Sequence, residues 1–311
     1  MKKVLLDFDI GTEIDDAIAL AYLLANPECG LVGITTSCGE SIKRAEMASV
    51  LCRAAGKKVP IHAGCERPLL IPQMETTAPQ AAILPHYEHD TGFAPNTAIP
   101  FMQKVIRENP GEVTLLAVAP MTNLGLLFAM DPELPELLDG LYLLCGSPTH
   151  QRHDVVTESL SAMERDDFIR VLASQGILEN NSIVDPHATS IVCRARCRNF
   201  VNIGNNVSSR VVMTPEEAER RFRHPIMQVV MSIAREWFKD EPRVSFHDPL
   251  AAVCIFNDDV CSYKRGYMDC VLDSRLLGGM TIFREDPAGP HQVAWDVDGD
   301  KFFEHLFEVF A

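Results

Sequence analysis

Short apolar runs alternate with longer segments of helical periodicity along this chain. The short runs are typical of buried strands, and apolar residues spaced three and four apart are typical of helices that pack on them. Predicted strands lie at Val4–Phe8, Leu31–Thr35, Val59–His62, Val113–Ala119, Leu141–Cys145 and Phe200–Ile203. Predicted helices lie at Ile14–Ala25, at Ile42–Ala55 and after Thr122. This order predicts an α/β protein with an open, mostly parallel sheet flanked by helices.

Two segments interrupt the alternation. Residues 66–98 are rich in Pro, Thr and His and have little periodicity, which predicts a long functional loop or flap. Residues 146–180 are polar, with a helix expected from about Arg165 to Ser174, and are interpreted as an excursion from the core. Thr214 and Pro215 predict a further helix start. From about Tyr267 the chain is β-rich and ends in a helix at Lys301–Phe310. No repeat or linker divides the sequence, so we expect one domain over residues 1–311.

The first predicted strand ends in a dense group of acids. Asp7, Asp9, Asp15 and Asp16 surround one strand-to-helix turn at Gly11. Carboxylates this close repel one another unless a cation or several N–H donors hold them. Because α/β proteins bind ligands at the carboxyl ends of their strands, the pattern predicts a divalent metal site. The alternative, that Asp15 and Asp16 only complement the helix dipole, leaves the other two acids unexplained.

Polar residues follow other predicted strands as well. Thr122 comes after the apolar run LLAVA, and the segment Glu179–Asn181 follows a polar stretch. His247 and Asp248 precede the apolar run AAVCIF. Taken alone, Asp248 could simply cap its helix and His247 could be structural. Their adjacency, in a chain with an acidic first strand, favours a functional interpretation.

The composition restricts the ligand. Apolar residues make up 47% of the chain and charged residues 23%, and the formal net charge is −15. This charge argues against nucleic acid and against an anionic membrane surface, and it fits a small neutral or cationic ligand or an acidic metal site. No apolar run is long enough to span a bilayer. The ten cysteines lack zinc-site spacing and no signal peptide is visible, so we expect reduced thiols in a cytoplasmic protein.

Five segments in order resemble the nucleoside hydrolase family, the calcium-dependent N-ribohydrolases that cleave the bond between ribose and base. DFDIGTEIDDAIAL resembles the family's opening aspartate motif, in the variant with two extra residues between the glycine and the Asp pair. APMTNL resembles GPLTNL, and ENNSIVDPHA resembles the family's glutamate–asparagine segment followed by DPEA. FHDPLA resembles HDPLA, and LLGGMTIF resembles the late RGMT strand. The resemblance implies the nucleoside hydrolase fold, with a Rossmann-like core.

Carried over residue by residue, the resemblance implies one Ca²⁺ as the cofactor. Its ligands would be Asp9, Asp16, the carbonyl of Thr122 and Asp248, all of them oxygen donors that suit a hard cation. Asp9 would also accept a proton from an activated water, and His247 would donate to or orient the leaving base. The sugar would be bound by Asp15, Glu179 and Asn181. The substrate would be a nucleoside, and we expect a homodimer or homotetramer.

The chain departs from the family pattern at the substrate pocket. Glu40 follows Gly39 where the family usually has Asn or Asp, and we expect it to contact the ribose. The loop PHYEHDTGFAP resembles the family's flap, in which His86 and His89 compete for one place, and His89 is the predicted substrate contact. Neither the choice of purine or pyrimidine nor the asparagine that reads the 5′ end of the sugar follows from the sequence.

Two other functions compete. One is a haloacid-dehalogenase-type phosphatase, with Asp7 as nucleophile, Mg²⁺ as the metal and Asp258 and Asp259 as a late acidic pair. Its threonine would sit one place too late at Thr12, and no lysine occupies a convincing strand end. The other is a calcium-dependent nucleoside or sugar binder with an impaired site, which Glu40 and the altered segment 146–180 motivate. The intact acidic set favours the hydrolase.

Overall fold

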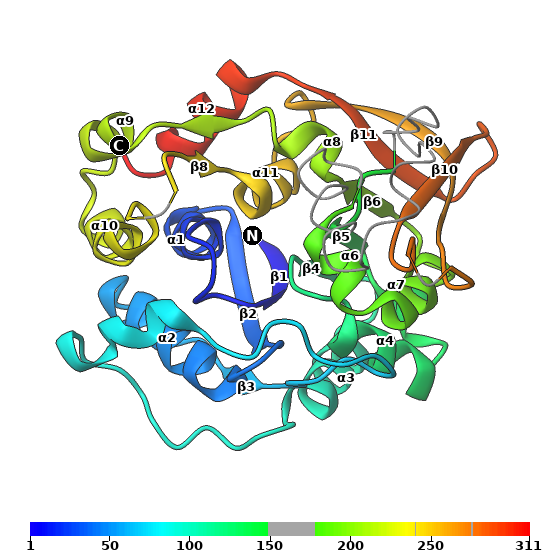
Figure 1. Ribbon diagram of the computed structural model, residues 1–311, viewed down its shortest axis with the longest axis horizontal. Helices are drawn as coiled ribbons and strands as arrows, with labels where there is room; N and C mark the ends of the chain where they lie inside the picture. The colour runs from blue at the N-terminus through cyan, green and yellow to red at the C-terminus, as the bar shows by residue number, and fades with distance from the viewer. Residues whose placement is uncertain (149–177, 240, 275) are drawn as a thin grey trace.

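The computed structural model describes residues 1–148, 178–239, 241–274 and 276–311 (Figure 1). Nine strands form one sheet in the order β10-β9-β11-β6-β5-β4-β1-β2-β3. The strands from β11 to β3 pair in parallel, whereas β9 is antiparallel to both β10 and β11. The predicted α/β class with a mostly parallel sheet is confirmed. The helix expected near Arg165 lies outside the described residues.

The strands and helices alternate through most of the chain. The strands are β1 Lys2–Phe8, β2 Cys29–Thr36, β3 Ile61–Ala63, β4 Val113–Ala117, β5 Gly140–Leu144, β6 Phe200–Ile203, β7 Val212–Met213, β8 Val244–Ser245, β9 Cys261–Cys270, β10 Thr281–Glu285 and β11 His291–Val297. The helices are α1 Asp15–Ala25, α2 Ser41–Ala54, η1 Pro79–His86, α3 Ala98–Glu108, α4 Thr122–Met130, η2 Leu134–Leu137, α6 Asn180–Val184, α7 Pro186–Cys193, α8 Asn205–Ser208, α9 Pro215–Arg221, α10 Pro225–Trp237, α11 His247–Cys254 and α12 Gly299–Glu308.

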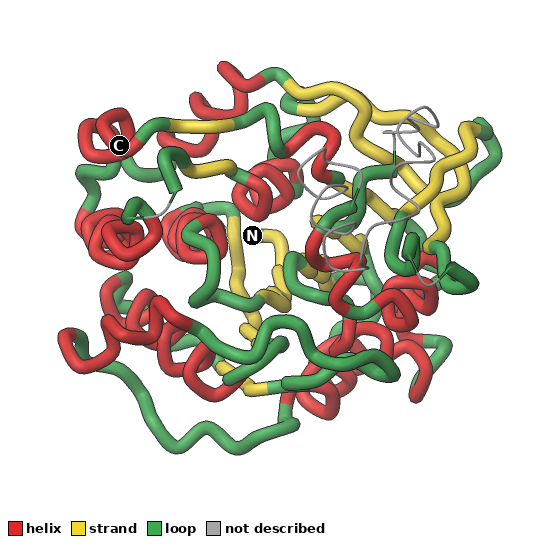
Figure 2. The backbone as a smooth tube through the Cα atoms, viewed as in Figure 1, coloured by secondary structure: helices red, strands yellow, loops and turns green. Residues whose placement is uncertain are grey.

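Helices cover both faces of the sheet (Figure 2). Successive side chains of a strand point to opposite faces, so β1 serves two hydrophobic cores. Val4, Leu6 and Phe8 pack with α1, α2, α10, α11 and α12, while Leu5 packs with α3, α4 and α7. A strand buried on both faces reads as a continuous apolar run. This double burial explains why the sequence marks β1 so clearly.

Several boundaries differ from the sequence prediction for identifiable reasons. The antiparallel strand β9 begins at Cys261 rather than near Tyr267, because Ser262 and Arg265 face solvent and interrupt the apolar pattern. The loop expected at 66–98 contains the 3-10 helix η1. The start of α9 is as predicted: the Glu217 N–H donates to Thr214 Oγ1 at 3.3 Å.

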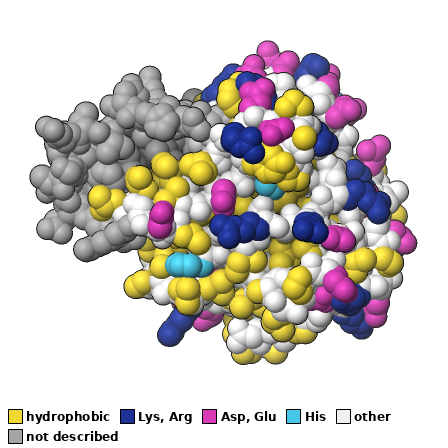
Figure 3. All heavy atoms as spheres, turned by 90° about the vertical axis from the view of Figure 1, so that its right-hand side faces the viewer, with side chains coloured by type: hydrophobic (Ala, Val, Ile, Leu, Met, Phe, Trp, Pro, Cys, Tyr) yellow, Lys and Arg dark blue, Asp and Glu magenta, His cyan; other side chains and the backbone are white. Residues whose placement is uncertain are grey.

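The antiparallel end of the sheet forms the face shown in Figure 3, where hydrophobic and charged side chains are interspersed. Two exposed rings on these strands lie beside cations. Lys264 Nζ is 3.7 Å from the ring centre of Trp295, and the Arg284 guanidinium carbon is 4.6 Å from that of Tyr267. All ten cysteines are free thiols. Within the described part of the chain, no helix has the length and apolarity needed to cross a membrane.

Candidate functional site

The acidic residues of the sequence motifs meet at the carboxyl end of β1. Asp9 follows that strand, Asp15 and Asp16 open α1, and Asp248 lies in the first turn of α11. Helices α1 and α11 pack against each other, which brings residues more than 200 positions apart into one cluster. All four side chains are buried, with no more than 7% of each residue exposed. The fold therefore assembles the acidic group that the sequence predicts.

Backbone N–H groups hold two of these carboxylates in place. Asp16 Oδ1 accepts a hydrogen bond from the N–H of Asp9 at 3.1 Å. Asp15 Oδ2 accepts from the N–H groups of His247 and Asp248, each at 3.1 Å. The N-terminus of α11 is thus capped by a carboxylate from another helix, and Asp248 does not cap it. Asp248 remains available for a ligand.

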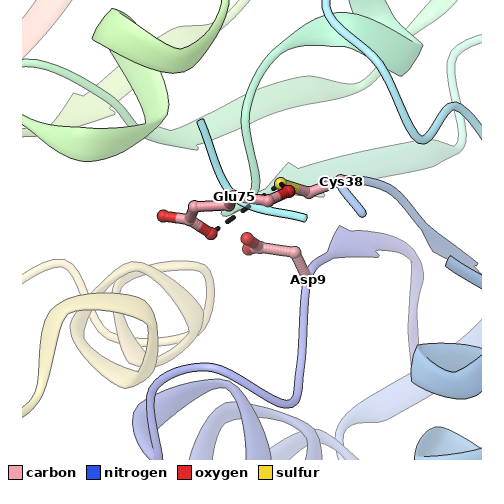
Figure 4. Close-up of side chains that lie close together, drawn as sticks. All are labelled: Asp9, Cys38 and Glu75. Atoms are coloured by element: carbon pink, nitrogen blue, oxygen red, sulfur yellow. Dashed lines mark hydrogen bonds between the residues drawn. The ribbon is translucent and has the colours of Figure 1, made fainter. Parts of the chain in front are cut away.

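The carboxylates fall into two groups that could each hold a cation. One ligand atom from each of Asp15, Asp16 and Asp248 lies within 4.8 Å of the others. A second group combines Asp9 with Cys38 and Glu75, and Figure 4 shows these three side chains converging from β1, from the segment after β2 and from the long loop. The family resemblance implies Asp9, Asp16, Asp248 and the Thr122 carbonyl as cation ligands, with Asp15 on the sugar. In the structure the Asp15 carboxylate also lies close to those of Asp16 and Asp248.

Burial makes this cluster unfavourable without a cation. Desolvation is the largest cause that raises the pKa of Asp9, Asp16 and Asp248 well above the ordinary range, and neighbouring carboxylates raise it further. For Asp9, the nearby Arg44 guanidinium acts in the opposite direction. A divalent cation among these oxygens would reverse the balance and favour the ionised forms.

Arg44 supports the cluster from behind and was not predicted. It lies in α2, is fully buried, and donates only to groups that are not carboxylates. Arg44 connects three segments: the turn after β1, the segment after β2 and the segment before η1. Its acceptors are the carbonyls of Asp9, Ile10, Gly39 and Thr77 and the hydroxyl of Thr12. This network fixes the backbone that carries Asp9.

Glu179 and Asn181 approach the cluster from the opposite side. Glu179 caps α6: its Oε1 accepts from the Asn181 N–H at 2.7 Å and its Oε2 from the Gly146 N–H at 2.6 Å. Burial raises the pKa of Glu179 to about 7, against the effect of these N–H groups. Asn181 Nδ2 donates to the carbonyls of Val118 at 2.8 Å and Leu144 at 3.1 Å, beyond β4 and at the end of β5. Among the described residues, none donates to its amide oxygen, which is therefore available to a ligand.

These residues line a cavity of about 220 Å³. His247 also lines it, with Nδ1 at 2.7 Å from Ser208 Oγ, and burial lowers the pKa of this histidine while Asp15 opposes the shift. Thr122 starts α4 and is not among the residues that line the cavity; its hydroxyl donates to Asp185 Oδ2 at 2.8 Å. Seven carboxylates line the cavity, from Asp9, Glu13, Asp15, Asp16, Glu75, Glu179 and Asp248.

Comparison with known proteins identifies the family. A family model described as inosine-uridine preferring nucleoside hydrolase matches residues 4–304. The chain belongs to the nucleoside hydrolase family. Family membership indicates hydrolysis of the N-glycosidic bond of nucleosides and a bound metal ion.

Curated relatives extend over nearly the whole chain. An inosine-uridine preferring nucleoside hydrolase of Crithidia fasciculata is 26% identical and covers 97% of this chain and 95% of its own. Uridine nucleosidase 1 of Arabidopsis thaliana is 23% identical, with 98% of this chain and 92% of its own covered. Among solved structures, the inosine-uridine preferring nucleoside hydrolase of Bacillus anthracis has a TM-score of 0.78 at 18% identity over 99% of both chains.

Two expected substrate contacts of this nucleoside hydrolase lie outside the cavity. Glu40 adopts a left-handed backbone conformation with φ of 58°, pairs with Lys43, and accepts a hydrogen bond from the Ala78 N–H at 2.9 Å. His89 Nδ1 lies 2.8 Å from the Tyr87 carbonyl oxygen. Neither lines the cavity. Loop packing, which the local sequence does not encode, turns Glu40 outward and brings Glu75 inward.

The phosphatase alternative does not fit this nucleoside hydrolase. The phosphatase hypothesis uses Asp7 as the nucleophile, but Asp7 is fully buried. Asp7 Oδ1 accepts hydrogen bonds from Thr35 Oγ1 at 2.6 Å and from Asn123 Nδ2 at 2.8 Å. Asp259, from the late acidic pair, instead forms surface ion pairs with Lys301 at 2.9 Å and His305 at 3.1 Å. Asp7 is fully buried, is not among the residues that line the cavity, and already accepts two hydrogen bonds, so it is poorly placed to attack a phosphate.

Proposed function

We propose that this nucleoside hydrolase releases the base from ribonucleosides with a water activated at a calcium ion. The observation that carries the proposal is the convergence of Asp15, Asp16 and Asp248, with ligand atoms within 4.8 Å of one another, beside the buried Asp9. Buried carboxylates are rarely placed together without a counter-charge. The donors are oxygens, which suits a hard cation such as Ca²⁺.

The proposed ligands are the carboxylates of Asp9, Asp16 and Asp248 and the carbonyl of Thr122. Asp15 would bind the ribose diol through Oδ1, because its Oδ2 already accepts two backbone N–H groups. Glu179 and Asn181 would hold the other side of the sugar, where the amide oxygen of Asn181 has no donor among the described residues and is the proposed acceptor. Glu40 and His89 are left out of this set because neither side chain lines the cavity and both contact other groups: Lys43 and the Ala78 N–H for Glu40, and the Tyr87 carbonyl for His89.

Each group then has a chemical task. Calcium, when bound, would supply the positive charge that lowers the pKa of a coordinated water. Asp9 would accept the proton of that water. The surrounding carboxylates would favour the positive charge that develops on the sugar as the glycosidic bond breaks. His247, fixed through Nδ1 by Ser208, would present Nε2 to the leaving base.

A screen of nucleosides tests this function. Uridine, cytidine, inosine and adenosine would each be incubated with the protein, and free ribose measured before chelation, after chelation and after calcium is added back. We expect ribose from at least one of them, loss of activity on chelation and recovery with calcium. Calcium bound near stoichiometry without ribose release from any of them would instead point to a modified ribonucleoside as the substrate or to the nucleoside binder.

A further inference from the structure

The loop that carries Glu75 is fixed directly over the turn after β2. The Ala78 N–H donates to Glu40 Oε2 at 2.9 Å, and a side chain on Gly39 would place its Cβ 2.5 Å from the carbonyl oxygen of Glu75. Only glycine permits this approach of the two backbones. The contact directs the Glu75 carboxylate into the cavity beside Asp9 (Figure 4). Glu75 is therefore a built-in part of the cavity wall.

Five of the seven cavity carboxylates have an evident counterpart. Asp15 and Glu179 accept backbone N–H groups at the starts of α11 and α6. Asp9, Asp16 and Asp248 are the proposed cation ligands. A divalent cation offsets only part of the charge of this group. The two remaining carboxylates, Glu13 and Glu75, need a separate explanation.

Glu13 and Glu75 receive little compensation from the described chain. Glu75 accepts from two uncharged donors, Asn180 Nδ2 and Cys38 Sγ, the latter at 3.7 Å. Among the described residues no hydrogen-bond donor reaches the Glu13 carboxylate, and neither Lys nor Arg lines the cavity. Arg44 is committed to backbone carbonyls and a hydroxyl behind the site. Glu13 also belongs to the turn between Gly11 and α1.

We propose that Glu13 and Glu75 form an acidic pair that selects ribonucleosides whose base carries a fixed positive charge, as an N-alkylated heteroaromatic ring does. The inference rests on the proposed hydrolysis. In that reaction the C1′–N bond breaks with both electrons going to nitrogen, so the cationic ring leaves as a neutral base. Water forms the new C1′–O bond, and its proton passes to Asp9 and then to solvent. Such a base needs no proton from an acid in order to leave.

The test compares cationic and neutral substrates across matched variants. The wild type, Glu13→Gln, Glu75→Gln and the double variant would be assayed with nicotinamide riboside and 7-methylguanosine as cations, and with uridine and guanosine as neutral counterparts. We expect the ratio of kcat/KM for cation over neutral substrate to fall about tenfold in the double variant, through loss of charge attraction. The effect should shrink as salt is added. Glu219→Gln, an exposed acid on α9, serves as the control.

The two cations separate a pyridinium from an N-alkylated purine, and a selective fall for either supports the acidic pair. An equal fall for cationic and neutral substrates would overturn the proposal, because it would indicate general stabilisation of charge on the sugar. If the wild type bound two calcium ions and the double variant only one, the proposal would also be overturned, in favour of a second metal site. If no nucleoside is cleaved, the proposed function fails. Calorimetric binding of nicotinamide riboside to the wild type and the double variant then still decides the inference.

Discussion

Two parts of the cavity lining are built differently, and we call them the sheet wall and the loop wall. The sheet wall consists of Asp9, Asp15, Asp16 and Asp248, which stand at the end of β1 and at the starts of α1 and α11. These side chains are buried. The loop wall consists of Glu13 and Glu75, which are only partly buried and lie in connecting segments. The sheet wall is positioned by core packing, whereas the loop wall depends on contacts between loops.

This difference suggests a division of tasks. Side chains at strand ends and helix starts keep their geometry when residues elsewhere are substituted. Metal-dependent chemistry requires such a fixed geometry. Loops tolerate substitution and insertion, and binding specificity commonly resides in them. We therefore expect changes in the sheet wall to abolish turnover and changes in the loop wall to alter substrate choice.

The largest effect is expected for Asp9→Ala in the sheet wall. This change removes a proposed cation ligand and the proposed proton acceptor together, and acid–base assistance alone contributes about 10²–10⁴-fold. We expect kcat on the best nucleoside to fall by at least about 10³-fold, measured as ribose released per enzyme. The exposed variant Glu219→Gln should retain wild-type turnover. Near-normal turnover in Asp9→Ala would show that the sheet wall does not carry the chemistry.

Arg44→Met tests the support behind the sheet wall. The change leaves four carbonyls and one hydroxyl without their donor. Orphaned buried polar groups cost on the order of 1–3 kcal/mol each before relaxation, so urea unfolding should show a loss of about 3 kcal/mol or more. Calcium titration should show weaker binding. Arg53→Met, an exposed residue of the same helix, is the control, and equal stability of the two variants would contradict the structural role of Arg44.

His247→Ala separates chemistry from packing beside the sheet wall, next to Asp248. If His247 assists the leaving base, the variant should lose about 10²-fold on a natural nucleoside but little on p-nitrophenyl riboside, whose leaving group departs as a stable anion. Ser208→Ala, which removes the partner of Nδ1, should show a weaker form of the same pattern. Equal losses on both substrates, together with weaker calcium binding, would mean that His247 only positions Asp248.

Sequence reasoning located the sheet wall because its residues follow strands or open helices. Asp9, Asp15, Asp16, His247 and Asp248 were all predicted, and all line the cavity. The carboxyl ends of parallel strands share one edge, so their adjacency in space follows from the fold class. The grouping of Asp15 with Asp16 and Asp248 did not follow, because it depends on the rotation of α1 against α11.

The loop wall could not be predicted in the same way. Glu75 enters the cavity only because its loop crosses Gly39, a contact between segments about 35 residues apart with no periodic signature. Glu40 lies outside the cavity because it contacts the same loop, through the Ala78 N–H. Arg44 did have a signal, since it shares a helical face with Met47, Ala48 and Leu51, which are all buried. A charged residue on such an apolar stripe indicates a buried network.

A fourth prediction concerns Asp7, which lies beneath the sheet wall. Its Oδ2 has no partner among the described residues, and burial raises its pKa from 3.8 to about 7. The folded protein therefore holds this proton more tightly than the unfolded chain, and stability should fall as pH rises from about 4 to about 7. In Asp7→Asn the side chain cannot ionise, so this variant should lack the loss of stability that Asp7 causes between about pH 4 and about pH 7. The urea midpoints of the wild type and of Asp7→Asn, measured with chelator over that pH range, should converge or cross as pH rises. Midpoints that stay a constant distance apart would contradict an effect of burial on the pKa of Asp7.

The smallest effect is expected for Glu40, which supports the loop wall from outside. Glu40→Ala removes the acceptor of the Ala78 N–H. Because one hydrogen bond contributes about 0.5–1.5 kcal/mol net, KM should rise only about two- to tenfold, with calcium affinity unchanged.

Two matched variants separate support of the loop from contact with the sugar. Glu40→Gln keeps an oxygen for the Ala78 N–H and should remain close to wild type. Lys43→Met breaks only a surface ion pair and should change little. If Glu40 instead contacts the ribose, as the sequence suggested, both Glu40 variants would lose kcat together. That result would place Glu40 inside the cavity and make the loop wall, like the sheet wall, part of the reaction itself.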